Sequence, residues 1–125
     1  MLSISRNIAA PPELVWGLLT DLDQWPRWGP TVAGATIDGD SEGKLRLGAR
    51  GTVRTAAGVS LPFAVTRFDD GRRWAWRVAG VTATDHRVEP SPGGSTVTFG
   101  VPWWAPGYLA VCAIALRRIE RLALD

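Results

Sequence analysis

The 125 residues of this chain include one cysteine and carry a formal net charge of +2, and both facts limit what the protein can be. The length predicts a single domain, residues 1–125, which can bury a core and a modest cavity. One cysteine excludes an intramolecular disulfide, and no charged-then-apolar leader opens the chain, so we expect a soluble cytoplasmic protein.

The first part of the chain predicts a strand followed by two short helices. Residues 2–9 alternate between apolar and polar side chains, and Arg6 is the exception on the apolar face. We expect Arg6 either to anchor an anionic ligand or to extend its charged end past the sheet. After a Pro-Pro pair, an apolar stripe predicts a helix, and a second helical turn is expected from Asp21 to Trp25.

Six further alternating runs predict a sheet. They cover residues 32–39, 45–55, 59–68, 72–79, 82–89 and 94–103. The short gaps between them, such as GDSEG at residues 39–43, are rich in turn residues and predict antiparallel hairpins. The side chains predicted to face inward are Val53, Thr55, Leu61, Phe63, Val65, Trp74, Trp76, Val78, Thr84, His86, Val88, Val97, Phe99, Val101 and Trp103.

One run, RRWAWR at residues 72–77, has the mixture of arginines and aromatic rings that single-stranded nucleic acids bind. In a strand, however, Trp74 and Trp76 point to one face and Arg73 and Arg77 to the other. The rings and most of the charges then point apart, so we expect no nucleic-acid partner.

Residues 106–124 predict a long amphipathic helix. Its apolar stripe consists of Leu109, Cys112, Leu116, Ile119 and Ala123. In the middle of this stripe, Cys112 is expected to be a small buried hydrophobe rather than a reactive thiol. The uncharged run over residues 90–116 also suggests a membrane span, but prolines and glycines interrupt it, so we expect at most transient membrane contact.

The order of these elements predicts an α+β fold, in which a curved antiparallel sheet covers the apolar faces of all three helices. Within it, residues 8–16 (IAAPPELVW), 19–21 (LTD) and 25–28 (WPRW) resemble the amino-terminal signature of the START-like or SRPBCC superfamily, which includes the polyketide cyclase/dehydrase and lipid-transport group. Residues 86–90 (HRVEP), followed by a Gly-Gly pair and residues 95–98 (STVT), resemble the penultimate hairpin of the same group.

The resemblance implies a helix-grip fold, in which seven strands wrap around the last helix and leave a hydrophobic cavity between sheet and helix. Members range from lipid and hormone carriers to aromatase/cyclases and co-chaperones, so the resemblance does not carry a substrate. The compact loops of this chain imply a smaller cavity than the lipid carriers have.

Seven tryptophans are more than a chain of this size needs to fill its core, which suggests an aromatic pocket. We expect the gap between sheet and last helix to bind a small aromatic, polyketide-like or lipid-like molecule. The residues predicted to line it are Phe63, Trp74, Trp76, His86, Phe99, Leu109, Cys112 and Leu116. The alternative is a purely structural role, in which these side chains only fill the interior.

Catalytic groups are few in this sequence. His86 is the one histidine and Tyr108 the one tyrosine, and both are weak candidates for proton transfer. Alternation places Asp85 on the face opposite His86, which argues against a dyad of the two. No metal-ligand spacing or nucleotide-binding motif occurs, so we expect no metal and no cofactor.

Three hypotheses remain open from the sequence. The first is a carrier or binding protein for a small hydrophobic molecule. The second is a cyclase/dehydrase-type enzyme that folds a polyketide-like chain. The third is a ligand-free interaction module that uses the corner at residues 103–106 (WWAP) as an apolar patch. The sequence leaves monomer and homodimer equally open.

Overall fold

The computed structural model describes residues 1–39 and 44–125. In chain order its elements are β1 (Leu2–Ile8), α1 (Pro12–Thr20), the 3-10 turn η1 (Leu22–Gln24), α2 (Trp25–Trp28), β2 (Val32–Ile37), β3 (Arg50–Thr55), β4 (Ser60–Asp69), β5 (Arg73–Val78), β6 (Val81–Ser91), β7 (Gly94–Val101) and α3 (Tyr108–Leu124).

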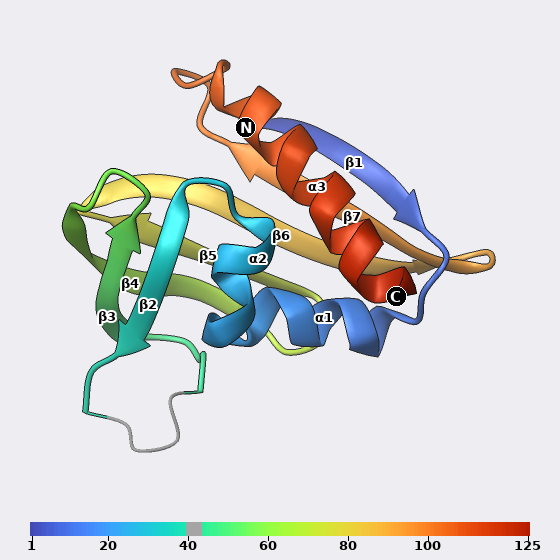
Figure 1. The fold of residues 1–125 in the computed structure, drawn as a ribbon, viewed down its shortest axis with the longest axis horizontal. Helices are drawn as coiled ribbons and strands as arrows, with labels where there is room; N and C mark the ends of the chain where they lie inside the picture. The colour runs from blue at the N-terminus through green and yellow to red at the C-terminus, as the bar shows by residue number, and fades with distance from the viewer. Residues whose placement is uncertain (40–43) are drawn as a thin grey trace.

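All seven strands form one antiparallel sheet in the order β1-β7-β6-β5-β4-β3-β2. The sheet is curved, and the helices lie on one side of it, with α3 running beside β1 and β7 (Figure 1). This arrangement buries the apolar stripe of every helix against one sheet face. The predicted α+β helix-grip fold is confirmed.

The strands predicted over residues 45–55 and 94–103 are longer than the observed β3 and β7. The strand predicted from residue 45 begins at Arg50, because Leu47 and Gly48 form a turn in which Gly48 has a φ of 79°. The last strand ends at Val101, since Pro102 has no N–H with which to continue the ladder. Trp103 is therefore 77% exposed, and the prediction that it faces inward was wrong. Except for Gly39, the turn predicted over residues 39–43 lies outside the described residues.

The stripe of α3 packs as predicted at its centre. Cys112, Leu116 and Ile119 are almost completely buried, whereas Leu109 and Ala123 are only partly buried. Burial raises the pKa of the Cys112 thiol from 9.0 to about 11, because the charged thiolate is poorly solvated there. The thiol therefore stays protonated near neutral pH, in agreement with its interpretation as a small hydrophobe.

Arg6 joins β1 to the last helix. Its Nε and Nη2 atoms donate to Oε1 of Glu120 over 3.0 and 2.8 Å. The pair is partly open to solvent, since the two side chains are 40% and 27% exposed. The positive charge that seemed misplaced on the apolar face of β1 is thus paired with a carboxylate of α3.

Replacing Arg6 by methionine is expected to lower the free energy of unfolding by less than about 1 kcal/mol, because solvent screens an ion pair at this exposure. Methionine keeps most of the apolar stem of the side chain. Urea unfolding of both proteins measures the difference. A loss of several kcal/mol would mean that the ion pair behaves as a buried one.

Within residues 1–39 and 44–125, no helix is long and apolar enough to cross a membrane. The uncharged run after residue 90 is instead divided between β6, β7, a loop and the first half of α3.

Candidate ligand-binding pocket

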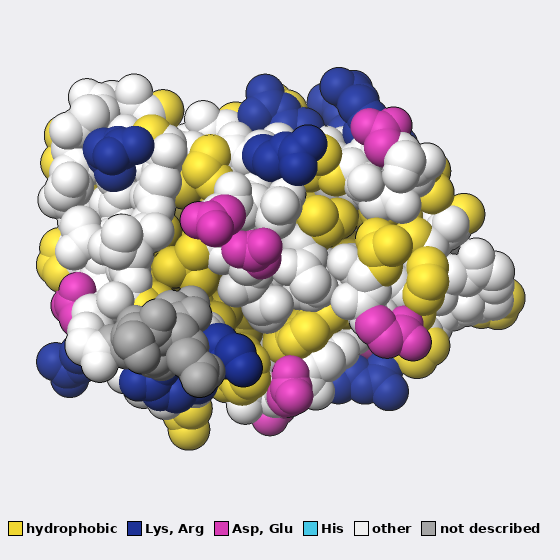
Figure 2. All heavy atoms as spheres, turned by 60° about the horizontal axis from the view of Figure 1, so that its bottom comes forward, with side chains coloured by type: hydrophobic (Ala, Val, Ile, Leu, Met, Phe, Trp, Pro, Cys, Tyr) yellow, Lys and Arg dark blue, Asp and Glu magenta, His cyan; other side chains and the backbone are white. Residues whose placement is uncertain are grey.

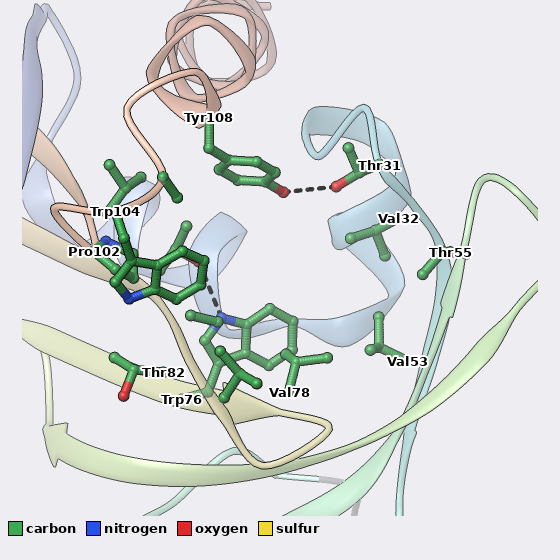
Figure 3. A pocket seen from close by; sticks show the side chains of 15 residues that line it. Thr31, Val32, Val53, Thr55, Trp76, Val78, Thr82, Pro102, Trp104 and Tyr108 are labelled. Atoms are coloured by element: carbon green, nitrogen blue, oxygen red, sulfur yellow. Dashed lines mark hydrogen bonds between the residues drawn. The ribbon is translucent and has the colours of Figure 1, made fainter.

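A pocket of about 370 Å³ lies at one end of the sheet, between the loop before α3 and the ends of β2, β3, β5 and β6 (Figure 3). Its lining is mostly aliphatic and aromatic. The lining residues are Thr31, Val32, Val53, Thr55, Trp76, Val78, Val81, Thr82, Ala83, Thr84, Val101, Pro102, Trp104, Ala105 and Tyr108. None of them carries a charge near neutral pH, so the pocket suits an uncharged apolar molecule.

An irregularity in the sheet shapes one wall of this pocket. Between the pairs Ala75–Asp85 and Arg77–Thr82, β5 has one residue while β6 has two, which is a β-bulge. Thr82, Ala83 and Thr84 are consecutive, yet all three line the pocket. Strict alternation would have turned the middle one of them to the opposite face.

A tight hairpin turn brings β6 back beside β5 at the same end of the sheet. Ala79 and Gly80 both have positive φ angles, 52° and 77°, as the type I′ form of a two-residue hairpin turn requires. Val78 and Val81, on either side of this turn, pair with each other and both line the pocket.

Two hydroxyl groups face each other across the upper side of the pocket (Figure 3). The Tyr108 hydroxyl, at the first residue of α3, lies 2.8 Å from Oγ1 of Thr31. Burial raises the pKa of Tyr108 above its ordinary 10.0, and the hydrogen bond with Thr31 offsets this only in part. The phenol therefore stays protonated and can donate or accept one hydrogen bond in an otherwise apolar lining.

A chain of hydrogen bonds leads from the pocket wall to His86. The Trp76 indole donates to Thr84 Oγ1 over 3.0 Å, and Thr84 Oγ1 lies 3.2 Å from Nε2 of His86. On the other side of the ring, Nδ1 lies 3.2 Å from the Trp74 carbonyl oxygen. Because a carbonyl can only accept, Nδ1 carries the proton and Nε2 accepts from the Thr84 hydroxyl.

His86 is neutral at physiological pH. Burial lowers its pKa from 6.5 to about 4, since the imidazolium would lose its hydration, and the Trp74 carbonyl and the Asp85 charge oppose this shift only in part. Asp85 lies on the other face of the sheet, as alternation predicted, and is itself buried against Arg73, whose Nη2 is 2.8 Å from its Oδ2.

The predicted aromatic site exists as a cluster, but it is tightly filled. His86 stacks on Trp74 with ring centroids 3.9 Å apart, and Trp25 stacks on the other side of Trp74 at 5.2 Å. Trp28 approaches both His86 and Phe99, with centroid distances of 6.1 and 5.7 Å. The short helices thus fill most of the gap that the sequence suggested for a ligand.

What remains of the predicted site is a cavity of about 40 Å³. Five of the eight predicted residues line it, namely Trp74, Trp76, His86, Phe99 and Cys112. The other three, Phe63, Leu109 and Leu116, belong to the core or pack against it. Trp76 is the one member of the predicted set that also lines the 370 Å³ pocket.

The sequence reasoning missed most of the larger pocket. Alternation had placed Val53, Thr55 and Val78 on the inner face, so this wall could have been anticipated. Nothing local indicated that Trp104, beyond the last strand, would close the opposite side.

A third hollow of about 740 Å³ lies between α1 and β2. It is lined in part by charged groups, which include Asp21, Asp23, Asp70 and Lys44. Figure 2 shows the molecule from this side, where acidic and basic side chains are interspersed among hydrophobic ones. Asp21 acts as a cap here, because its Oδ1 accepts from the backbone N–H of Asp23 over 3.0 Å.

Across the residues that the structure describes, no three His, Cys, Asp or Glu side chains are grouped so that they could hold a metal ion. Within the 370 Å³ pocket, Tyr108 is the one lining residue that can titrate.

Comparison with known proteins agrees with this architecture. Residues 2–124 match the family described as polyketide cyclase / dehydrase and lipid transport. The chain belongs to this family. A curated relative, the putative polyketide cyclase of Streptomyces halstedii, is 35% identical over 91 residues, which are 68% of this chain and 71% of that protein.

Solved structures share the fold of this chain at low identity. A protein of Mesorhizobium loti has a TM-score of 0.75 at 16% identity, over 97% of this chain and 94% of that one. The AHSA1-like protein of Aeromonas hydrophila has a TM-score of 0.69 at 20% identity, over 99% and 94% of the two chains. At these identities the likeness establishes the fold alone, and it confirms the START-like architecture.

Proposed function

We propose that this protein binds a small, uncharged hydrophobic molecule in the 370 Å³ pocket at the end of the sheet. The observation that carries the proposal is the lining, which combines apolar walls with a single pair of hydroxyls, Tyr108 and Thr31. The volume lies near the lower end of the range of small-molecule sites. An aromatic or polyketide-like ring system, or a short acyl chain, meets these requirements.

The neutral dye N-phenyl-1-naphthylamine and its sulfonated analogue 8-anilinonaphthalene-1-sulfonate test this proposal as a pair. Both share the same ring system, and only the second carries a charge. We expect the neutral dye to bind at one site with energy transfer from tryptophan, and the sulfonate to bind at least about tenfold more weakly, because the lining offers no cation.

A variant with a larger side chain in the pocket tests whether the neutral dye binds there. Val78→Phe adds a ring to the lining and is expected to weaken dye binding at least about tenfold, while thermal unfolding shows that the fold is kept. Leu47→Phe is the matched control, because Leu47 is 64% exposed and lies outside the lining. Equal binding by both variants, or no binding of the neutral dye to the native protein, would rule out this pocket as the site.

A cyclase-type enzyme is the second candidate, and it is favoured by the Tyr108 hydroxyl in the pocket wall and by the name of the Streptomyces halstedii relative. The pocket would hold a polycarbonyl chain in a folded conformation, and the protonated phenol would donate a hydrogen bond to one carbonyl. Turnover of a polyketide mimic should then fall in Tyr108→Phe. Turnover that is unchanged in both Tyr108→Phe and His86→Gln would eliminate this candidate.

A further inference from the structure

Three uncharged loops directly follow residues that line the pocket, namely Thr55, Val78 and Val101. They are residues 56–59 (AAGV), 79–81 (AGV) and 102–107 (PWWAPG), and together we call them the apolar rim. Two of its side chains, Val81 and Trp104, also line the pocket. Part of the rim therefore borders the pocket, and Figure 3 shows Pro102 and Trp104 on one side of it.

The side chains of the apolar rim are unusually exposed for their size. Trp103 is 77% exposed and Trp104 is 55% exposed, while Val59 and Val81, at the tips of two hairpins, are 53% and 48% exposed. Apolar side chains gathered in this way indicate a surface that contacts an apolar partner.

The charges behind the rim have one sign. Residues 44–68, 71–84 and 90–119, which contain the three loops and the strand residues next to them, include no Asp or Glu. The acidic residues of these strands lie farther from the loops, with Asp69 at the other end of β4 and Asp85 and Glu89 further along β6. Arg54 and Arg77 are exposed near the ends of β3 and β5, and among the described residues neither of them pairs with a carboxylate. Arg54 makes one long contact, 3.4 Å, with the carbonyl oxygen of Ala33.

We propose that the apolar rim docks on the surface of a lipid bilayer that contains anionic lipids. Tryptophan prefers the interface between headgroups and acyl chains, where its ring is apolar and its N–H can still bond. Arg54 and Arg77 lie about three residues behind the hairpin tips, roughly 10 Å along a strand, which matches the depth to which interfacial segments enter. At that depth their guanidinium groups reach the lipid phosphates.

The shape of the rim favours a bilayer over a second copy of this chain. A stable protein interface needs about 800 Å² on each partner. Two hairpin tips and one loop around an open hollow offer little continuous surface for such contact, whereas a fluid bilayer adapts to separate tips. This consequence rests on the proposed ligand binding: when the rim is docked, the pocket faces the acyl chains of the bilayer. An apolar ligand can then pass from the bilayer into the pocket without crossing water.

Cosedimentation with vesicles tests the docking directly. We expect the native protein to bind phosphatidylcholine vesicles that contain phosphatidylglycerol, and to bind pure phosphatidylcholine more weakly. Trp103→Ala should weaken binding at least about tenfold, since one large ring no longer enters the interface. Arg77→Gln should reduce both the preference for phosphatidylglycerol and the sensitivity to salt. Leu47→Ala, which removes another large exposed apolar side chain outside the rim, should change nothing.

Two results would overturn the docking proposal. One is the failure of the native protein to bind either kind of vesicle. The other is equal vesicle binding by Trp103→Ala and Leu47→Ala. A dimer in size-exclusion chromatography that Trp103→Ala dissociates, without vesicle binding, would assign the rim to a second copy instead. Trp103 lies outside the pocket lining, so naphthylamine binding by Trp103→Ala reports on the pocket separately from the rim.

Discussion

Replacement of Trp25 by alanine is expected to lower the free energy of unfolding by about 3 to 5 kcal/mol, as large-to-small changes at fully buried aromatic residues do. Trp25 is 1% exposed and stacks on Trp74 with an interplanar angle of 7°. Its indole N–H donates to the Leu19 carbonyl over 2.9 Å, which ties α2 to the end of α1. Alanine removes the ring and leaves that buried carbonyl without its donor.

Urea unfolding followed by circular dichroism measures this loss, and Trp103→Ala is the matched control. The control removes the same side chain from a position that is 77% exposed, so it should change stability by no more than about 0.5 kcal/mol. Trp25→Phe should fall between the two, because it keeps an aromatic ring but lacks the N–H. A loss below about 1 kcal/mol in Trp25→Ala would show that the cluster is loosely packed.

Trp25 also shows why the sequence predicted the fold better than the site. The sequence predicted a helical turn from Asp21 that ends at Trp25, but the chain continues as α2 through Trp28. Pro26 does not stop it, because it lies in the first turn of α2, where its missing N–H is not needed. Residues three apart on a helix share one face, so Trp25 and Trp28 enter the gap between sheet and α3 together. That spacing was present in the sequence, but local pattern does not indicate how much of a distant gap two rings will fill.

The fold could be predicted because it is encoded in local sequence patterns. Alternation with period two identified the seven strands, and turn residues marked the hairpins. Errors occurred at strand ends, where Gly48 and Pro102 interrupt the ladder. These positions matter because the loop after Pro102 turns Trp103 outward and places Trp104 over the pocket.

The position of the pocket could not be predicted in the same way, because it depends on how segments far apart in the sequence pack together. The bulge between β5 and β6 is a property of how two strands pair, and neither strand shows it alone. It brings Ala83 to the pocket wall beside Thr82 and Thr84. Once the two indoles of α2 fill the centre of the gap, the remaining open volume lies at this end of the sheet.

The centre and the end of the sheet are nevertheless linked through hydrogen bonds. Trp76 forms part of the pocket wall, and through Thr84 it fixes the acceptor nitrogen of His86. A proton added at Nε2 would remove the acceptor that the Thr84 hydroxyl uses. Protonation of His86 should therefore disturb the Trp76 side of the pocket as well as the core.

Acidification from pH 7 to pH 4 is expected to destabilise the protein by about 3 kcal/mol through His86 alone. The pKa of His86 is about 4 in the folded protein, against an ordinary value of 6.5 when the chain is unfolded. Between these two values the unfolded chain binds a proton that the folded protein does not, so stability falls as pH falls through this window. Above it both states are neutral, and below it both are protonated, so the contribution is constant at either end.

The comparison with His86→Gln isolates this effect, because His86 is the one histidine of the chain. Urea unfolding of both proteins across the range gives two curves of stability against pH. The His86→Gln variant is expected to be less stable than the native protein at neutral pH, because it loses the stack of His86 on Trp74. Its free energy of unfolding should lack the decrease that the native protein shows between about pH 6.5 and 4. Parallel curves would mean that the imidazole takes up its proton without unfolding, and that the space around Thr84 and Trp76 accommodates the charge.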